Sequence, residues 1–120
     1  MDKFQAAFEI LYFLSAIDGE VSDSEIDVIL NFLKANQNKI DFVPTKVIES
    51  INLLKLDGMV DEFTRATLHF KDTSSAPDRI TFLNFALELI VADGKITEDE
   101  RNLFFILGDS WDIDMKKYLK

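Results

Sequence analysis

The sequence lacks cysteine and contains a single histidine among its 120 residues. Without cysteine the chain can form no disulfide, no thiolate metal site and no cysteine nucleophile, and this composition fits a reducing compartment. His69 has no second histidine with which to share a metal, and we expect it near a helix C-terminus, where the helix dipole favours it. A glycine-rich phosphate loop and the H-E-x-x-H and G-x-S-x-G motifs are also missing, so we expect no enzymatic activity.

Long hydrophobic runs and an excess of positive charge are missing as well. The apolar stretch FALELIVA at 85–92 is far shorter than a bilayer span and contains Glu88, so we expect no membrane insertion. The N-terminus MDKFQAAFEI does not resemble a signal peptide, which leads us to expect a cytoplasmic protein. With 13 Lys and Arg against 22 Asp and Glu, the net charge of −9 argues against nucleic acid as a partner, because phosphate binding needs basic side chains. Cations or basic protein surfaces are compatible with this charge.

Apolar residues, including eleven Phe, are plentiful enough for one core, and we expect a single domain over residues 1–120. They recur at intervals of three and four residues, which predicts amphipathic helices, and no segment alternates in the manner of paired strands. The predicted helices cover residues 2–16, 22–36, a segment from Pro44, 59–70, 77–92, 98–107 and a short segment from about 112. The predicted fold is therefore all-α, a compact bundle of about six to seven helices. Because the helix at 77–92 is apolar on more than one side, we expect it to be the most buried.

Turn residues predict where these helices end. Gly19 should end the first helix, DGM at 57–59 the third, and Gly108 the sixth. KDTSSAPD at 71–78 is the most loop-like stretch of the chain. The sole tryptophan, Trp111, stands between acids in DSWDID, and we expect it to close one edge of the core.

One eight-residue phrase occurs twice, as DGEVSDSE from Asp18 and as DGKITEDE from Asp93, 75 positions later (93 minus 18). In both copies the phrase follows an apolar helix, and the two preceding helices match in register. This self-similarity predicts an internal pseudo-two-fold repeat of helix-turn-helix units. The two phrases would then occupy equivalent environments.

Helix capping explains most of the repeated phrase. Ser22 is followed three positions later by Glu25, and Thr97 in the same way by Glu100, which is the pattern of a capping box. In a capping box the hydroxyl accepts a backbone N–H of the first turn, and the glutamate accepts the N–H of the capping residue itself. This reading leaves only the leading Asp of each copy without a structural role.

A divalent cation is the alternative explanation. The form D-G-x-h-[S/T]-x-x-E, in which h is apolar, matches the second half of a calcium-binding loop, where Gly makes the turn and the last Glu binds through both oxygens. The candidate ligands are Asp18, Glu25, Asp93 and Glu100, with possible support from Glu20, Ser22, Lys95 and Thr97. Apolar residues stand at the first and third ligand positions of both copies, so each turn offers about four of the six to eight oxygens that Ca²⁺ prefers. The capping and cation interpretations are compatible, and the sequence leaves both open.

The segments AIDGEVSDSE and VADGKITEDERNLFFILGDSWDID resemble the TerB family of tellurite resistance proteins. They also resemble the broader TerB-like group, which includes the N-terminal domain of a membrane-anchored DnaJ co-chaperone. The resemblance implies an all-helical domain with internal two-fold character, acids gathered into a negative surface, and a divalent-cation role with Ca²⁺ as the usual candidate. Carried over by position, it implicates the same four acids of the repeated phrase.

Two functions are expected on these grounds. The first is a non-enzymatic TerB-like module that binds divalent cations such as Ca²⁺ at the two turns and mediates protein contacts in a stress response. The second is a purely structural protein-interaction domain without metal, whose acids serve as helix caps and as a negative docking face. A metal-dependent hydrolase is a third alternative, because clustered carboxylates can be catalytic. Under the first two, we expect a protein partner that the sequence does not identify.

Overall fold

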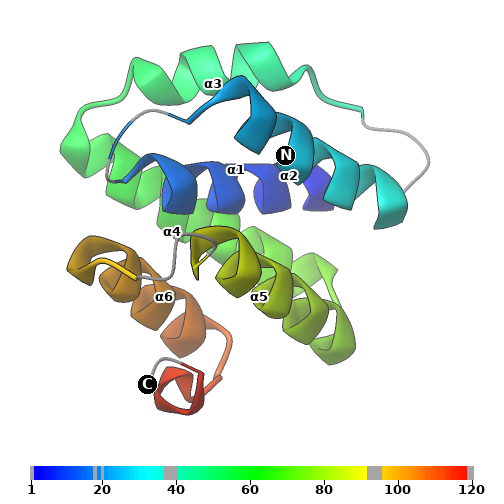
Figure 1. Cartoon of the computed structure of the whole chain (residues 1–120), viewed down its shortest axis with the longest axis vertical. Coiled ribbons are helices and arrows are strands. Elements are labelled where there is room, and N and C mark those ends of the chain that lie inside the picture. The colour runs from blue at the N-terminus through cyan, green and yellow to red at the C-terminus, as the bar shows by residue number, and fades with distance from the viewer. Residues whose placement is uncertain (1, 18, 20, 37–40, 92–95, 119–120) are drawn as a thin grey trace.

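The computed structural model describes residues 2–17, 19, 21–36, 41–91 and 96–118. Within these ranges all regular structure is helical (Figure 1). The elements are α1 (Lys3–Ala16), α2 (Asp23–Asn36), α3 (Pro44–Asn52), α4 (Leu56–Thr73), α5 (Ala76–Ile90), α6 (Glu98–Ser110) and the 3₁₀ turn η2 (Met115–Lys117). The all-α prediction is confirmed.

Helix α1 is the central element of the bundle. Asp2 caps its N-terminus by accepting the N–H of Gln5 at 2.7 Å, as its place before an apolar run predicts. The nine successive residues 6–14 are all buried. The main neighbour of α1 is α4, and α1 also packs against α2 and α5. In Figure 1, α1 and α4 lie across the middle of the molecule, with α3 at the top and α6 and η2 at the bottom.

The expectation that the helix at 77–92 would be the most buried is wrong. Four residues of α5 are buried, namely Phe82, Leu83, Ala86 and Ile90. Thr81, Asn84 and Glu88 are exposed at helical spacing, which gives α5 a polar face. In α1, by contrast, even Glu9 is buried. Periodicity identified both helices as apolar, but position in the bundle decides which of them is surrounded.

Aromatic side chains join α4, α5 and the segment after α6. The ring centroids of Phe70, Phe82 and Trp111 lie between 4.9 and 5.6 Å from one another. Trp111 is buried, and its indole Nε1 donates to the carbonyl oxygen of Thr67 at 2.9 Å. This bond satisfies the single polar group of the side chain. The prediction that Trp111 closes the core is confirmed.

The third helix ends earlier, and the fourth begins earlier, than the sequence predicted. Helix α3 stops at Asn52, and Asp57 and Gly58 lie in the first turn of α4 rather than in a turn between helices. An acid is favoured in a first turn by the helix dipole, and glycine within a helix costs only about 1 kcal/mol. The apolar spacing from Leu56 to Phe63 therefore outweighs the turn signal of the DG pair.

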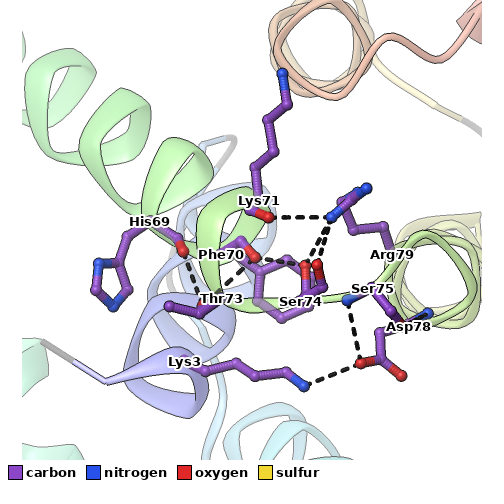
Figure 2. Close-up of polar contacts among 9 residues, drawn as sticks. All are labelled: Lys3, His69, Phe70, Lys71, Thr73, Ser74, Ser75, Asp78 and Arg79. Atoms are coloured by element: carbon purple, nitrogen blue, oxygen red, sulfur yellow. Dashed lines mark hydrogen bonds and ion pairs between the residues drawn. The ribbon is translucent and has the colours of Figure 1, made fainter.

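The stretch 71–78, predicted to be a loop, is mostly helical. Ser74 and Ser75 alone separate α4 from α5 (Figure 2). Arg79 closes the end of α4, because its guanidinium donates to the carbonyl oxygens of Lys71 at 3.0 Å and Ser74 at 2.7 Å. These bonds satisfy carbonyl groups that the end of a helix leaves without intrahelical partners.

A capping box starts α5 and ties it to α1. Ser75 Oγ accepts the N–H of Asp78 at 3.2 Å, and the Asp78 carboxylate accepts the N–H of Ser75 at 3.4 Å. The same carboxylate forms an ion pair with Lys3 of α1 at 3.0 Å (Figure 2). The hydrogen bonds with Lys3 and Ser75 lower the pKa of Asp78. The starts of α1 and α5 are thereby joined on the surface.

Gly108 lies within α6 instead of ending it. A Cβ atom at this position would come within 2.1 Å of Met115 Cγ. The missing side chain therefore allows η2 to pack directly against α6, which continues to Ser110. Glycine at position 108 therefore permits the close approach of Met115 and does not mark the end of the helix.

Candidate functional site

Both copies of the repeated phrase begin a helix with the same hydrogen bonds. Ser22 Oγ accepts the N–H of Glu25 at 3.2 Å, and Glu25 Oε1 accepts the N–H of Ser22 at 3.2 Å. At the start of α6, Thr97 Oγ1 accepts the N–H of Glu100 at 3.2 Å, and Glu100 Oε1 accepts the N–H of Thr97 at 3.0 Å. The two predicted capping boxes are confirmed, and the two helix starts match in their local geometry.

Four of the eight residues predicted as cation ligands lie outside the residues that the structure describes. These are Asp18, Glu20, Asp93 and Lys95. Where the chain is described, no group of three or more Asp, Glu or His side chains lies close enough together to hold a metal ion. The cation site at the two turns therefore stays a prediction.

A cavity of about 620 Å³ opens beside the first of these turns, and we call it the apolar cavity. It is lined by residues from the end of α1, the start of α2, the end of α3 and the start of α4. The end of α1 and the start of α4 lie at the left of Figure 1. Its walls include Tyr12, Phe13, Ile48, Met59, Phe63 and, from α6, Leu103. None of the described residues that line it is charged. The Tyr12 hydroxyl donates to Asn52 Oδ1 at 3.4 Å, so these two polar side chains of the wall bond to each other.

Uncovered apolar side chains lie at the mouth of the apolar cavity. Leu56 lines the cavity while 73% exposed, and Val60 lines it while 47% exposed. Ile17, at the end of α1, is a third lining residue that is exposed. The apolar surface therefore continues from inside the cavity to the outside of the molecule. Contiguous apolar surface of this kind marks interaction sites on proteins.

Exposed acids stand on the helices that form the apolar cavity, and we call Asp23, Glu49, Asp57 and Asp99 the acidic rim. Each precedes a lining residue by three or four positions along its helix. The lining residues in question are Ile26, Asn52, Val60 and Leu103. Residues at this spacing share a helix face, so each acid lies on the face of its helix that also carries a lining residue of the cavity. Two of the acids come from the repeated phrase, whose first copy also supplies Gly19 and Val21 to the lining of the cavity.

A second cavity, of about 400 Å³, lies beside the N-terminal half of α1, and we call it the carboxyl cavity. Its lining includes Gln5, Glu9, Phe42, Lys46, Glu62 and Arg65. Glu9 is only 1% exposed, and its Oε2 accepts a hydrogen bond from Gln5 Nε2 at 3.3 Å. A hydrogen bond also joins its carboxyl group to that of Glu62, which pairs with Arg65 at 2.9 Å. In the carboxyl cavity, a series of hydrogen bonds and an ion pair thus connects Gln5 of α1 to Arg65 of α4.

The two carboxyl groups of this cavity hold one proton between them. Burial raises the pKa of Glu9 to about 8, and the hydrogen bond and negative charge of Glu62 act in the same direction. Partial burial opposes ionisation of Glu62, but hydrogen bonds from Glu9 and Arg65 and the charge of Arg65 lower its pKa. At neutral pH Glu9 is therefore the protonated donor and Glu62 the carboxylate acceptor.

Sequence reasoning missed both cavities. The walls of the apolar cavity come from α1, α2, α3, α4 and α6, so no single segment carries its pattern. A signal for the carboxyl cavity was present, because Glu9 is the one charged residue in the run AAFEILYFL at 6–14. A charge at the centre of an otherwise apolar helix requires a partner inside the fold.

Comparison of the sequence with protein-family models identifies the family of this chain. The family model described as tellurite resistance protein TerB matches residues 5–113. The chain belongs to the TerB family. The match includes both copies of the repeated phrase and all the helices that form the two cavities, so both cavities lie in the TerB domain. Comparisons with curated proteins and with solved structures found no match.

The TerB assignment confirms the resemblance drawn from the repeated phrase. No helix in the described part of this TerB-family chain is long and apolar enough to cross a membrane. The capping residues and the acidic rim are thus features of a helical TerB domain.

Proposed function

We propose that this TerB-family chain is a non-enzymatic protein-binding module that docks a partner at the apolar cavity. The observation that carries the proposal is a cavity whose described lining residues carry no charge, with Leu56 and Val60 uncovered at its mouth. Its volume of about 620 Å³ falls within the range of ligand-binding sites. Burial of exposed apolar area is the main favourable term in protein association.

The use made of the acids supports a binding role over a catalytic one. Glu25 and Glu100 serve as helix caps, and Glu9 and Glu62 bond to each other in the carboxyl cavity. The exposed acids of the rim would form a negative docking face around the mouth. The tellurite-resistance description of the family supports a place for this docking in a response to chemical stress.

Site-specific photo-crosslinking in the native host cell tests the docking proposal. A photoreactive amino acid at position 56 should yield a discrete protein adduct, and the same amino acid at Glu88, on the exposed face of α5, should not. Adding Val60→Glu to the position-56 variant should abolish the adduct, because it places a charge in the mouth of the cavity. If position 56 gives no more adduct than position 88, protein docking at the apolar cavity is wrong.

Divalent-cation binding at the two turns is a second candidate. Each capping box engages only Oε1 of its glutamate, so Oε2 of Glu25 and of Glu100 takes no part in the cap. Capping and weak coordination of Ca²⁺ are therefore compatible at the same residue. This would add a regulatory ion to the docking module.

A calcium titration monitored by thermal unfolding tests the cation candidate. Ligand that binds only the folded state stabilises it by about 2.7 kcal/mol at a hundredfold excess over the dissociation constant. Combined Asp18→Asn and Asp93→Asn should remove the stabilisation while leaving the capping residues intact. Absence of any shift with Ca²⁺ or Mg²⁺ at millimolar concentration would leave the acids with capping and docking roles only.

A further inference from the structure

We propose that the segment docked in the apolar cavity is an amphipathic helix flanked by lysine or arginine residues. This inference rests on the proposed docking function and names the class of partner. Three features of the described structure support it: the type of its secondary structure, the uncovered apolar side chains at the mouth of the cavity, and the sign of the charge around that mouth.

The secondary structure of the described residues favours a helical partner. All regular structure there is helical, so the described surface offers no strand edge to which a partner strand could add. Most lining residues of the cavity lie in helices and contribute apolar side chains to its wall, so side chains would make most of the contact with a partner. An amphipathic helix, which presents apolar side chains at intervals of three and four residues, can insert those side chains into such a cavity.

The uncovered side chains favour a partner larger than a small molecule. Leu56 and Val60 belong to the cavity lining and also face solvent, and Leu53, which is 86% exposed, lies just beyond the end of α3. A ligand confined to the cavity would leave this outer surface wet. A helix lying across the mouth would cover it while its apolar side chains fill the interior.

The acidic rim selects for positive charge in the partner. Asp23, Glu49, Asp57 and Asp99 are all exposed and share helix faces with lining residues of the cavity, and the chain as a whole has a net charge of −9. Lys55, the N-cap of α4, precedes the lining residue Met59 by four positions, so one described basic residue stands against these four acids at this spacing. Complementary charge at the rim of an interface speeds association and excludes partners of the same sign. An acidic helix or an anionic lipid would meet repulsion at this mouth.

Binding of three synthetic peptides to the full chain tests the inference. Each has about 18 residues, long enough to form a helix in isolation. The first has a leucine face and lysine flanks, the second has the same face with glutamate flanks, and the third contains the residues of the first in an order that breaks the apolar face. Fluorescence anisotropy at low salt should show the lysine peptide binding at least tenfold more tightly than either of the others. The advantage over the glutamate peptide should shrink as salt is added, because salt screens exposed charges.

Two matched variants locate the binding. Val60→Glu should weaken the lysine peptide at least tenfold, because the new charge lies in the cavity mouth. Val28→Glu, on α2 and outside the cavity lining, should leave it unchanged, although Val28 is exposed to a similar extent, 45% against 47%. Both variants add the same charge, so a difference between them reports the site. Thermal unfolding of each variant confirms that it remains folded.

Reversal of the rim charge tests the sign of the partner. Combined Glu49→Lys and Asp57→Lys should weaken the lysine peptide about tenfold and strengthen the glutamate peptide. If both peptides bind equally well and remain sensitive to Val60→Glu, docking at the cavity holds and the basic partner is wrong. If no peptide binding responds to Val60→Glu, both the inference and the docking function are overturned. The same conclusion follows if only the neutral dye Nile red binds in a manner sensitive to Val60→Glu, since the cavity then takes small apolar ligands.

Discussion

The N-terminal half of α1 borders a cavity with charged walls, whereas none of the described residues that line the cavity at its C-terminal half is charged. In the carboxyl cavity, Glu9 forms a hydrogen bond with Glu62, and Glu62 forms an ion pair with Arg65. These three side chains therefore have partners within the fold. In the apolar cavity, Leu56 and Val60 remain uncovered although they line the wall. Ile51 lines both cavities and forms part of the boundary between them. The apolar surface available to a partner therefore lies beside the C-terminal half of α1.

The largest expected effect distinguishes the floor of the apolar cavity from its mouth. Phe63→Ala should lower the free energy of unfolding by about 3–5 kcal/mol, because it deletes a buried ring from the core. Phe63 is 1% exposed, and its ring meets that of Phe13 edge-on at 5.9 Å. Leu56→Ala should change it by less than about 0.5 kcal/mol, because Leu56 is 73% exposed. Urea denaturation measures both, and a large loss from Leu56→Ala would show that the mouth is part of the core.

The next effect concerns the buried acid of the carboxyl cavity. The pKa of Glu9 is raised from its ordinary 4.5 to about 8 in the folded state. The folded state therefore binds this proton more tightly, so the stabilisation from Glu9 is complete below pH 4.5 and is lost as the pH rises toward 8. Glu9→Gln should remove this loss and raise stability at neutral pH by on the order of 2 kcal/mol.

The pH dependence supplies the control for that prediction. Glu9→Gln and the wild type should converge in stability near pH 4, where the carboxyl group is protonated in both the folded and the unfolded state. Glu88→Gln, which removes a carboxyl group at an exposed position on α5, is the matched control variant. Denaturation curves between pH 4 and 8 in which Glu9→Gln parallels the wild type would contradict the assignment of a buried proton to Glu9.

A smaller effect is expected at the two helix starts that carry the repeated phrase. Ser22→Ala and Thr97→Ala should each lower the free energy of unfolding by about 1 kcal/mol, because each removes one half of a capping box. The matched hydrogen bonds at the two turns predict that the two losses are similar. Chemical denaturation measures them. A loss at one turn alone would show that the two copies of the phrase are not structurally equivalent.

The smallest effect is a change in the titration of Glu9. Glu62→Gln removes the negative charge that helps to raise the pKa of Glu9, so that pKa should fall. It should remain well above 4.5, because burial is the largest cause of the shift and is unchanged. The carboxyl ¹³C resonance of Glu9 followed by NMR reports the midpoint. An unchanged midpoint would mean that the two carboxyl groups do not interact.

Local features of this fold could be predicted from its sequence. The capping box from Ser22 to Glu25 and the N-cap at Asp2 depend on residues three positions apart, and the buried Trp111 depends on its chemistry. Such features need no knowledge of the rest of the chain. The extent of α4 was harder, because the DG pair at 57–58 is a turn signal that helical packing overrides.

Features that depend on distant segments could not be predicted. The carboxyl cavity exists because Glu9 meets Glu62, 53 positions away (62 minus 9), and periodicity carries no information about that meeting. The central place of α1 has the same origin, since it depends on packing against α4. The apolar cavity draws on α1, α2, α3, α4 and α6 at once. The hydrophobic pattern predicts which face of a helix is buried, but it does not predict which other helix packs against that face.

The most direct test of this account is NMR chemical-shift mapping of the ¹⁵N-labelled full chain with the lysine-flanked amphipathic peptide. The account predicts that the backbone amides of Ile48, Val60 and Leu103 shift as the peptide is added, while those of Gln5 and Arg65 stay in place. Shifts that instead cluster around the carboxyl cavity, or that are equally large in Val60→Glu, would contradict the claim that the apolar cavity is the docking site.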